Sequence, residues 1–259
     1  MHLAFNSLYY RPEQYEEITQ IIQQCRSIGF DSYILADPAL LVYLRKEKID
    51  CEVHLSGDLG TVNSAMTEVF AKEYPKRIIF PAQKYDLGNA CSDSAYNCAE
   101  RAARKEWTYP TEFEAFALNE LCQFTGAFCN SLHCDEMGYL CRVPYWLGTV
   151  RNGEAVPKKI VALQEQAWNQ EPDLKAYDES GYLCGETGCG LCALYQLKQA
   201  GITHLKLVGR GNYVDHMEKD IRNLRKALEI LDAAEDETAF QCMIKRILFP
   251  HGCSEKCYY

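Results

Sequence analysis

Cysteine is the residue type through which this chain is best equipped to do chemistry. The 259 residues include 14 cysteines, and most of them are crowded into three segments. These segments run from Cys122 to Cys141, from Cys184 to Cys192 and from Cys253 to Cys257. Thiols at this density either pair as structural disulfides or ligate soft metals. A buried metal cofactor is therefore our first hypothesis.

The start of the chain favours metal over disulfides. Residues Met1 to Asn6 contain no basic region, no sustained apolar run and no small-residue cleavage site. They carry no mark for export and predict a cytoplasmic protein. In the reducing cytosol, closely spaced thiols hold metals more often than they pair with one another.

Composition and charge narrow the class of protein. Hydrophobic residues make up 47% of the chain and charged residues 24%, which is typical of one globular domain that can bury a core. The formal net charge of -9 offers no broad basic surface for nucleic acid or an anionic membrane. No run approaches the roughly 20 apolar residues that span a bilayer. We expect no membrane association and no nucleic-acid partner.

Hydrophobic periodicity predicts an α/β fold. Short apolar runs alternate with amphipathic segments, as in repeated β-α units with mostly parallel strands. Strands are expected at 3–8, 32–35, 52–56, 77–80, 112–118 and 204–208. Helices are expected at 12–28, 38–47, 61–73, 93–106, 160–168, 190–200, 214–234 and 238–248. The spacing between strands, roughly twenty to thirty residues, predicts an incomplete or distorted TIM-like barrel.

The domain organisation follows from these elements. A single barrel-like domain is expected over residues 1–248, with a cysteine-rich insert at 122–192. The last segment, 249–259, is a short tail that contains Cys253 and Cys257. Its cysteines make it unlike a simple solvated terminus.

Residues 53–63 have the sequence VHLSGDLGTVN, which resembles the strand, turn and helix of the collagenase-like peptidase family U32, whose catalytic type is unassigned. Three further segments resemble that family in the same order. Residues 112–129 resemble its strand leading into a Cys-x6-Cys pair, here Cys122 and Cys129. The stretch from Cys141 to Tyr145 resembles its Cys-Arg-x-x-Tyr, and residues 189–210 resemble its cysteine, helix, turn and final strand. The resemblance covers about residues 3–213.

This resemblance implies an iron–sulfur protein. Members of the family are barrel-like, and several are similar to oxygen-independent hydroxylases of ubiquinone synthesis or tRNA uridine that hold a [4Fe-4S] cluster with four cysteines. Prephenate is the oxygen donor for some of them. The implied ligands here are Cys122, Cys129, Cys141 and Cys189, and Cys134 competes with Cys141 for the third place. The implied activity is redox or oxygen-atom transfer on a small or aromatic substrate.

The residues themselves support metal ligation in the same region. Loops beyond the carboxyl ends of barrel strands are where barrel active sites lie, and four thiolates meeting there would satisfy a cluster. Cys184, Cys189 and Cys192 form Cys-x4-Cys-x2-Cys, which resembles part of the plant-type ferredoxin run. Zinc accepts four thiolates equally well.

The cysteines exceed the needs of one cluster. Cys184, Cys192, Cys253 and Cys257 are candidates for a second metal centre, closed by the tail folding back. The alternative is that they are free or scattered thiols. The other cysteines lack metal spacing and are expected in the core or on the surface; they are Cys25, Cys51, Cys91, Cys98 and Cys242.

Four other residues are candidates for substrate chemistry. His54 could act as an acid or hydrogen-bond donor at the barrel mouth, or be a satisfied core histidine. Arg210 could clamp a carboxylate, or form a surface ion pair. Asn63 and Lys206 match family positions and would orient an anionic substrate.

The chain departs from the family pattern at several positions outside the cysteines. These departures bear on the identity of the substrate more than on the metal site. Leu118-Asn119-Glu120 stands where members commonly have His-Gly-Ala, and Val208 replaces an acidic residue. Pro81-Ala82-Gln83 stands in place of an Arg-Glu pair.

We expect an iron–sulfur enzyme with a small-molecule substrate. The alternatives are a peptidase, and a non-catalytic iron–sulfur subunit of a heteromeric complex. A hetero- or homodimer is the expected protein partnership.

Overall fold

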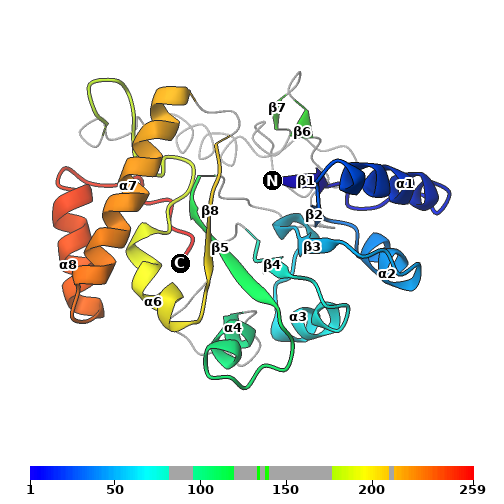
Figure 1. The fold of residues 1–259 in the computed structure, drawn as a ribbon. Helices are drawn as coiled ribbons and strands as arrows, with labels where there is room; N and C mark the ends of the chain where they lie inside the picture. Colours follow the sequence, from blue (N-terminus) through cyan, green and yellow to red (C-terminus); the bar gives the residue numbers. More distant parts are fainter. Residues whose placement is uncertain (82–95, 120–132, 135–137, 140–176, 210–212) are drawn as a thin grey trace, which may run out of the picture.

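The sheet of this protein is a curled half-barrel of parallel strands. The structure is a computed structural model that describes residues 1–81, 96–119, 133–134, 138–139, 177–209 and 213–259. Six strands pair in parallel, in the order β1-β2-β3-β4-β5-β8 (Figure 1). They are β1 (His2–Phe5), β2 (Ser32–Leu35), β3 (Glu52–Leu55), β4 (Arg77–Ile79), β5 (Glu112–Leu118) and β8 (His204–Leu207). The predicted α/β fold, an incomplete TIM-like barrel, is confirmed.

Helices connect the strands and cover the outer face of the sheet. They are α1 (Gln14–Ser27), α2 (Pro38–Lys46), α3 (Ser64–Ala71), α4 (Tyr96–Ala103), α6 (Leu194–Gln199), α7 (Val214–Ala233) and α8 (Glu237–Leu248). Two 3-10 turns, η1 (Gly57–Leu59) and η5 (Leu191–Ala193), precede α3 and α6. Helices α6, α7 and α8 gather beyond β8, on the side of the molecule where the chain ends (Figure 1).

The predicted elements are found with small shifts at their ends. The helix expected from residue 61 begins at Ser64, because the Asn63 side chain accepts a hydrogen bond from Met66 N at 2.9 Å and caps it. The helix expected at 190–200 is divided into η5 and α6. The short hairpin of β6 (His133–Cys134) and β7 (Gly138–Tyr139) was not predicted. The helix expected at 160–168 and most of the insert at 122–192 lie outside the described residues.

The main core lies between the sheet and its helices. Along β5, the buried side chains of Phe113 and Ala115 belong to the same cluster as Val53, Leu55 and Ile78 from neighbouring strands. Alternate residues of a strand point to opposite faces, so these positions share the outer face. Burial of each large apolar side chain contributes roughly 1.5–3 kcal/mol, which makes this layer the main source of stability.

A second, smaller cluster occupies the inner face of the half-barrel. Ile79 of β4 and Phe116 of β5 pack there with Tyr258 from the C-terminal tail. Tyr259 and Val208 are half-buried against the same cluster. The tail therefore packs against the concave side of the sheet, next to β4 and β5.

Charged side chains connect the amino ends of three strands. Arg77, the first residue of β4, makes 3.0 Å contacts with Glu112 and Glu114 of β5. Its Nη2 atom also lies 2.7 Å from His204 Nε2 on β8. Burial raises the pKa of Glu112, but hydrogen bonds from Lys76 and Arg77 outweigh this and hold that pKa below its usual value. The network helps to fix the register of β4, β5 and β8.

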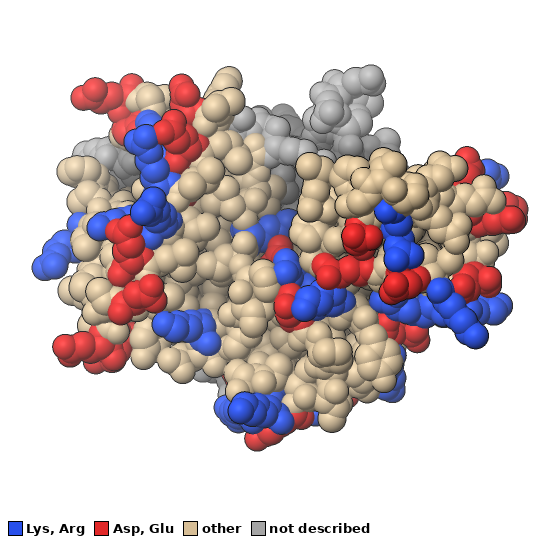
Figure 2. Space-filling model, viewed as in Figure 1, with Lys and Arg blue, Asp and Glu red and all other residues tan. Residues whose placement is uncertain are grey.

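The visible surface carries charges of both signs. Figure 2 shows acidic and basic side chains interspersed over this face, without a large field of one sign. Among the described helices, none combines the length and apolar character that a membrane crossing requires.

Candidate metal centre

Cys189 lies at the carboxyl end of β5. It forms an antiparallel bridge with Leu118, the last residue of that strand. On either side, Gly190 N donates to Ala117 O at 2.8 Å and Asn119 N donates to Gly188 O at 2.8 Å. The backbone of Cys189 is therefore fixed at the carboxyl end of β5, an interior strand of the sheet, and barrel proteins place their active sites at this end of their strands.

Two glycines allow the chain to pack closely around Cys189. Gly185 has a φ of +68°, and a Cβ atom added there would lie 2.5 Å from Cys189 Cβ. A Cβ at Gly190 would lie 2.9 Å from both Phe116 O and the Tyr259 ring. A side chain at either position would push the Cys189 loop away from its neighbours.

The C-terminal tail pairs with the backbone of Cys189. Cys189 N donates to Lys256 O at 2.8 Å, and Tyr258 N donates to Cys189 O at 3.0 Å. Cys189 and Cys257 thereby form a parallel bridge. The residue at the end of β5 is thus held between that strand and the tail.

Aromatic side chains anchor the tail beyond this bridge. Tyr258 is fully buried, its ring centroid lies 6.1 Å from that of Phe116, and its hydroxyl donates to Asn119 O. Tyr259 OH donates to Phe116 O at 3.1 Å. Both rings therefore hold Cys257 close to Cys189.

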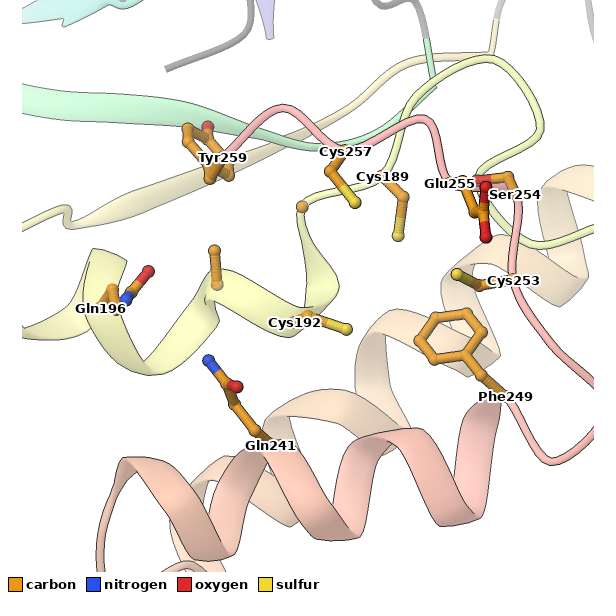
Figure 3. A pocket seen from close by; sticks show the side chains of 12 residues that line it. Cys189, Cys192, Gln196, Gln241, Phe249, Cys253, Ser254, Glu255, Cys257 and Tyr259 are labelled. Carbon is orange, nitrogen blue, oxygen red and sulfur yellow. The ribbon is translucent and has the colours of Figure 1, made fainter. Parts of the chain in front are cut away.

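Four cysteines line one cavity of about 100 Å³. They are Cys189, Cys192, Cys253 and Cys257. Figure 3 shows their sulfur atoms directed toward a common space, with Cys192 approaching from η5 and Cys253 from the chain that follows α8. Two segments that are distant in the sequence thus bring their thiols together.

Burial and neighbouring thiols raise the pKa values of Cys189 and Cys192. Burial is the main cause that raises the pKa of Cys189 well above its ordinary value, and the neighbouring Cys184 raises it further. Burial also raises the pKa of Cys192, reinforced by Cys257 and opposed by Lys245. A soft metal ion or cluster would deprotonate and stabilise such a set, so the donors fit a thiolate metal centre.

The sulfur atoms of the cavity are spread more widely than the ligand atoms around a single bound ion. Among the described residues, one set of three or more potential ligand atoms lies within 4.8 Å of one another, and it is His2, Glu52 and His54. No three sulfur atoms of the cavity are that close. Around tetrahedral zinc, with bonds near 2.3 Å, thiolates are about 3.8 Å apart.

Cys184 lies beside the cavity without lining it. Its thiol is hydrogen-bonded with Tyr182 and Asn223, and burial is the main cause that raises its pKa to about 12. Tyr182 OH in turn donates to Asp220 Oδ1 at 2.7 Å. Cys184 thus belongs to a buried polar network next to the four thiols.

Asn119 is the centre of that network. It has a φ of +65°, a conformation that asparagine tolerates better than most residues. Its Nδ2 donates to Asp220 Oδ2 at 2.7 Å and to Val208 O at 3.0 Å. Its backbone carbonyl oxygen accepts a hydrogen bond from Tyr258 OH. One polar residue after β5 therefore connects β8, α7 and the tail.

The structure brings together part of the predicted metal site. Cys189 and Cys192 share the cavity with Cys253 and Cys257 of the expected second centre. Cys134 ends β6, and its side chain is outside the described part of the structure. The remaining predicted residues, Cys122, Cys129, Cys141 and Arg210, lie outside the described residues.

The other candidate residues lie in three different places. His54 is 2% exposed, and its Nε2 atom is hydrogen-bonded to Glu52 Oε1 at 2.9 Å. It lies among the amino ends of the strands rather than beside the thiols. Burial is the main cause that lowers its pKa. Asn63 uses its side chain to cap α3. Lys206 Nζ lies 5.2 Å from the centroid of the Phe116 ring, on the inner face.

Sequence reasoning missed the residues that seat the tail. Tyr258, Tyr259, Gly190 and Asn119 were not identified, although each contacts the Cys189 region. One signal was available in the sequence. Two aromatic residues directly after Cys257 are unusual in a solvated terminus and predict that the terminus packs against the body of the protein.

Comparison with known proteins gave one match. A family model described as Peptidase family U32 matches residues 1–255. No curated protein and no solved structure matches the chain. The matched range contains the whole half-barrel, Cys189, Cys192 and Cys253, and it ends two residues before Cys257.

Proposed function

This chain belongs to peptidase family U32, and on that premise we propose that it is an iron–sulfur protein acting in redox or oxygen-atom transfer chemistry. The observation that carries the proposal is the cavity lined by four cysteines beside the carboxyl end of β5. Thiolates are the ligands that iron–sulfur clusters require. The expected substrate is small or aromatic.

Cys189 is the ligand on which the family resemblance and the geometry agree. The resemblance gives it the partners Cys122, Cys129 and either Cys141 or Cys134. Leu118, which is bridged to Cys189, precedes Cys122 by four residues. The chain that leaves β5 therefore starts next to Cys189.

The inner face of the half-barrel offers groups for a substrate. Lys206 supplies a positive charge, and its Nζ atom lies over the buried ring of Phe116. An anionic group of the substrate would pair with Lys206. The cluster, when bound, would supply electrons one at a time. Tyr258 and Tyr259 share this face, which favours a small substrate.

The peptidase activity in the family name is the alternative. A cysteine nucleophile needs a lowered pKa and an electropositive setting. Burial instead raises the pKa values of Cys184, Cys189 and Cys192. These described thiols are therefore suited to metal ligation rather than to attack on a peptide bond.

Anaerobic purification followed by iron and sulfide counting tests the proposal. We expect about four irons and four sulfides per cluster and a brown protein. Cys189→Ser should lose at least half of the iron. Cys242→Ser, which alters an exposed thiol on α8, should keep it all. Colourless protein without iron, even after anaerobic reconstitution with iron and sulfide, would contradict the proposal.

The spectrum of the cluster-loaded protein distinguishes an enzyme from the third hypothesis, a non-catalytic iron–sulfur subunit. An enzyme cluster with an open coordination position should change its absorbance and electron paramagnetic resonance signal when small anions are added. A fully ligated structural cluster should not respond. An unchanged spectrum would favour the non-catalytic subunit.

A further inference from the structure

We propose that the C-terminal tail supplies two ligands of the metal centre, with Cys253 and Cys257 joining Cys189 and Cys192 as four thiolates around one metal group. The inference rests on the proposed function for the identity of that group, an iron–sulfur cluster. It assigns Cys189 different partners from those that the family resemblance implies. The family match ends at residue 255, so Cys257 lies outside it.

The four thiols approach as two pairs. Cys189 and Cys192 form a Cys-x2-Cys pair that starts at the end of β5 and continues into η5. Cys253 and Cys257 form a Cys-x3-Cys pair in the tail. Pairs of this spacing, contributed by two separate segments, are the usual way in which proteins surround a metal with four thiolates.

Contacts of the tail that involve no cysteine side chain fix the second pair. The backbone bonds of Cys189 to Lys256 and Tyr258 align the two segments at 2.8 and 3.0 Å. The buried Tyr258 ring and its bond to Asn119 hold the end of the tail in place. These contacts between protein groups position the tail thiols, which lowers the entropic cost of ligation.

The two cysteine pairs differ in how far they are buried. Cys189 is buried and Cys192 is partly buried, whereas Cys253 and Cys257 are exposed. The cavity is thus closed on the side of the barrel and reachable from the side of the tail. A metal group could enter from that side.

The other groups around the cavity permit an anionic thiolate centre. Lys245 of α8 is near enough to Cys192 to favour its thiolate. Gln196 and Gln241 line the cavity with neutral amides. Glu255 is the acidic side chain among the lining residues, and it is exposed to solvent.

Thiol protection in the unaltered protein gives the first test. The anaerobically loaded chain and the same chain after chelation are treated with iodoacetamide, and modification of each cysteine is measured by peptide mass spectrometry. We expect the metal to slow modification of Cys253 and Cys257 at least tenfold, while the exposed Cys242 reacts equally in both samples. Equal rates at the tail thiols with and without metal would overturn the inference.

Metal content of paired variants gives the second test. Cys253→Ser with Cys257→Ser should lose at least half of the iron of the unaltered chain. The matched control, Cys25→Ser with Cys242→Ser, should lose none. Cys122→Ser with Cys129→Ser reports on the ligands implied by the family resemblance. Full iron in the tail variant would overturn the inference whatever the third variant shows.

The two proposals fail in different ways. Zinc without iron or sulfide, together with protection of the tail thiols, would refute the iron–sulfur function and support the ligand assignment. An iron–sulfur cluster with unprotected tail thiols would support the function and refute the assignment. Circular dichroism of each variant shows whether a loss of metal reflects a loss of fold.

Discussion

The carbonyl oxygen of Cys189 accepts a hydrogen bond from the backbone N–H of Tyr258 at 3.0 Å. This bond joins the residue at the end of β5 to the last segment of the chain. It places Cys257 beside Cys189 and brings Tyr258 onto the inner face of the sheet. The geometry of the thiol cavity therefore depends on how well the tail is seated.

Replacing Gly190 by alanine should displace the tail. The added methyl group would lie 2.9 Å from Phe116 O and from the Tyr259 ring, so one of them must move. Overpacking of this kind costs about 1–3 kcal/mol. We expect faster cleavage within residues 249–259 by a limiting amount of protease, measured by mass spectrometry. Cleavage at the rate of the unaltered protein would show that the tail is not packed against Gly190.

Replacing Tyr258 by phenylalanine should destabilise the protein by about 1–2 kcal/mol. The substitution keeps the buried ring but leaves Asn119 O without the hydroxyl that donates to it. Anaerobic urea unfolding measures the change. Tyr9→Phe is the matched control, because Tyr9 is 77% exposed and should contribute almost nothing. Equal stability of the two variants would argue against the buried hydrogen bond.

Replacing Arg77 by methionine should cost about 2–3 kcal/mol. Glu114, whose side chain is 11% exposed, would lose its ion-pair partner in a partly buried site. Adding Glu114→Gln should recover part of this loss, and the double-mutant cycle should give a coupling of about 1 kcal/mol or more. Arg225→Met, at an arginine that is 83% exposed, should cost less than about 0.5 kcal/mol. Additive effects at Arg77 and Glu114 would contradict the coupling.

Stability should fall as the pH drops below the ordinary histidine pKa of about 6.5. Burial lowers the pKa of His54 in the folded protein, so the unfolded chain takes up the proton first. The free energy of unfolding should therefore decrease between pH 7.5 and pH 5.5. Urea unfolding at both values should show a smaller decrease in His54→Gln.

His251→Gln, which alters an exposed histidine, serves as the control for this pH effect. It should keep the pH dependence of the unaltered protein. The ordinary pKa values of aspartate and glutamate, about 3.9 and 4.3, lie below this interval. An unchanged decrease in His54→Gln would show that His54 is not the group responsible.

Elements defined by a regular alternation of apolar residues could be predicted from the sequence. The strands at 32–35 and 112–118 were expected with the bounds that the structure shows. In β5, Phe113 and Ala115 face the helices while Phe116 faces the inner side, as the alternation indicates. The pattern follows from local geometry, since neighbouring strand residues point to opposite faces.

The seating of the tail could not be predicted in the same way. It depends on backbone hydrogen bonds between Cys189 and residues near the end of the chain, and such bonds leave no periodic pattern in the sequence. The division of the helix at 190–200 has a related cause. Gly190 must lie close to Phe116 and Tyr259, so the chain enters α6 through a tight 3-10 turn instead of a regular helical start.

The strand order has a consequence for synthesis on the ribosome. Strands β1 to β5 are neighbours in the order in which they are translated, so a nascent chain can assemble them progressively. Cys189 emerges well before its backbone partners Lys256 and Tyr258. The backbone bonds that hold Cys189 against the tail therefore form only after the strands and helices up to residue 248 have been synthesised.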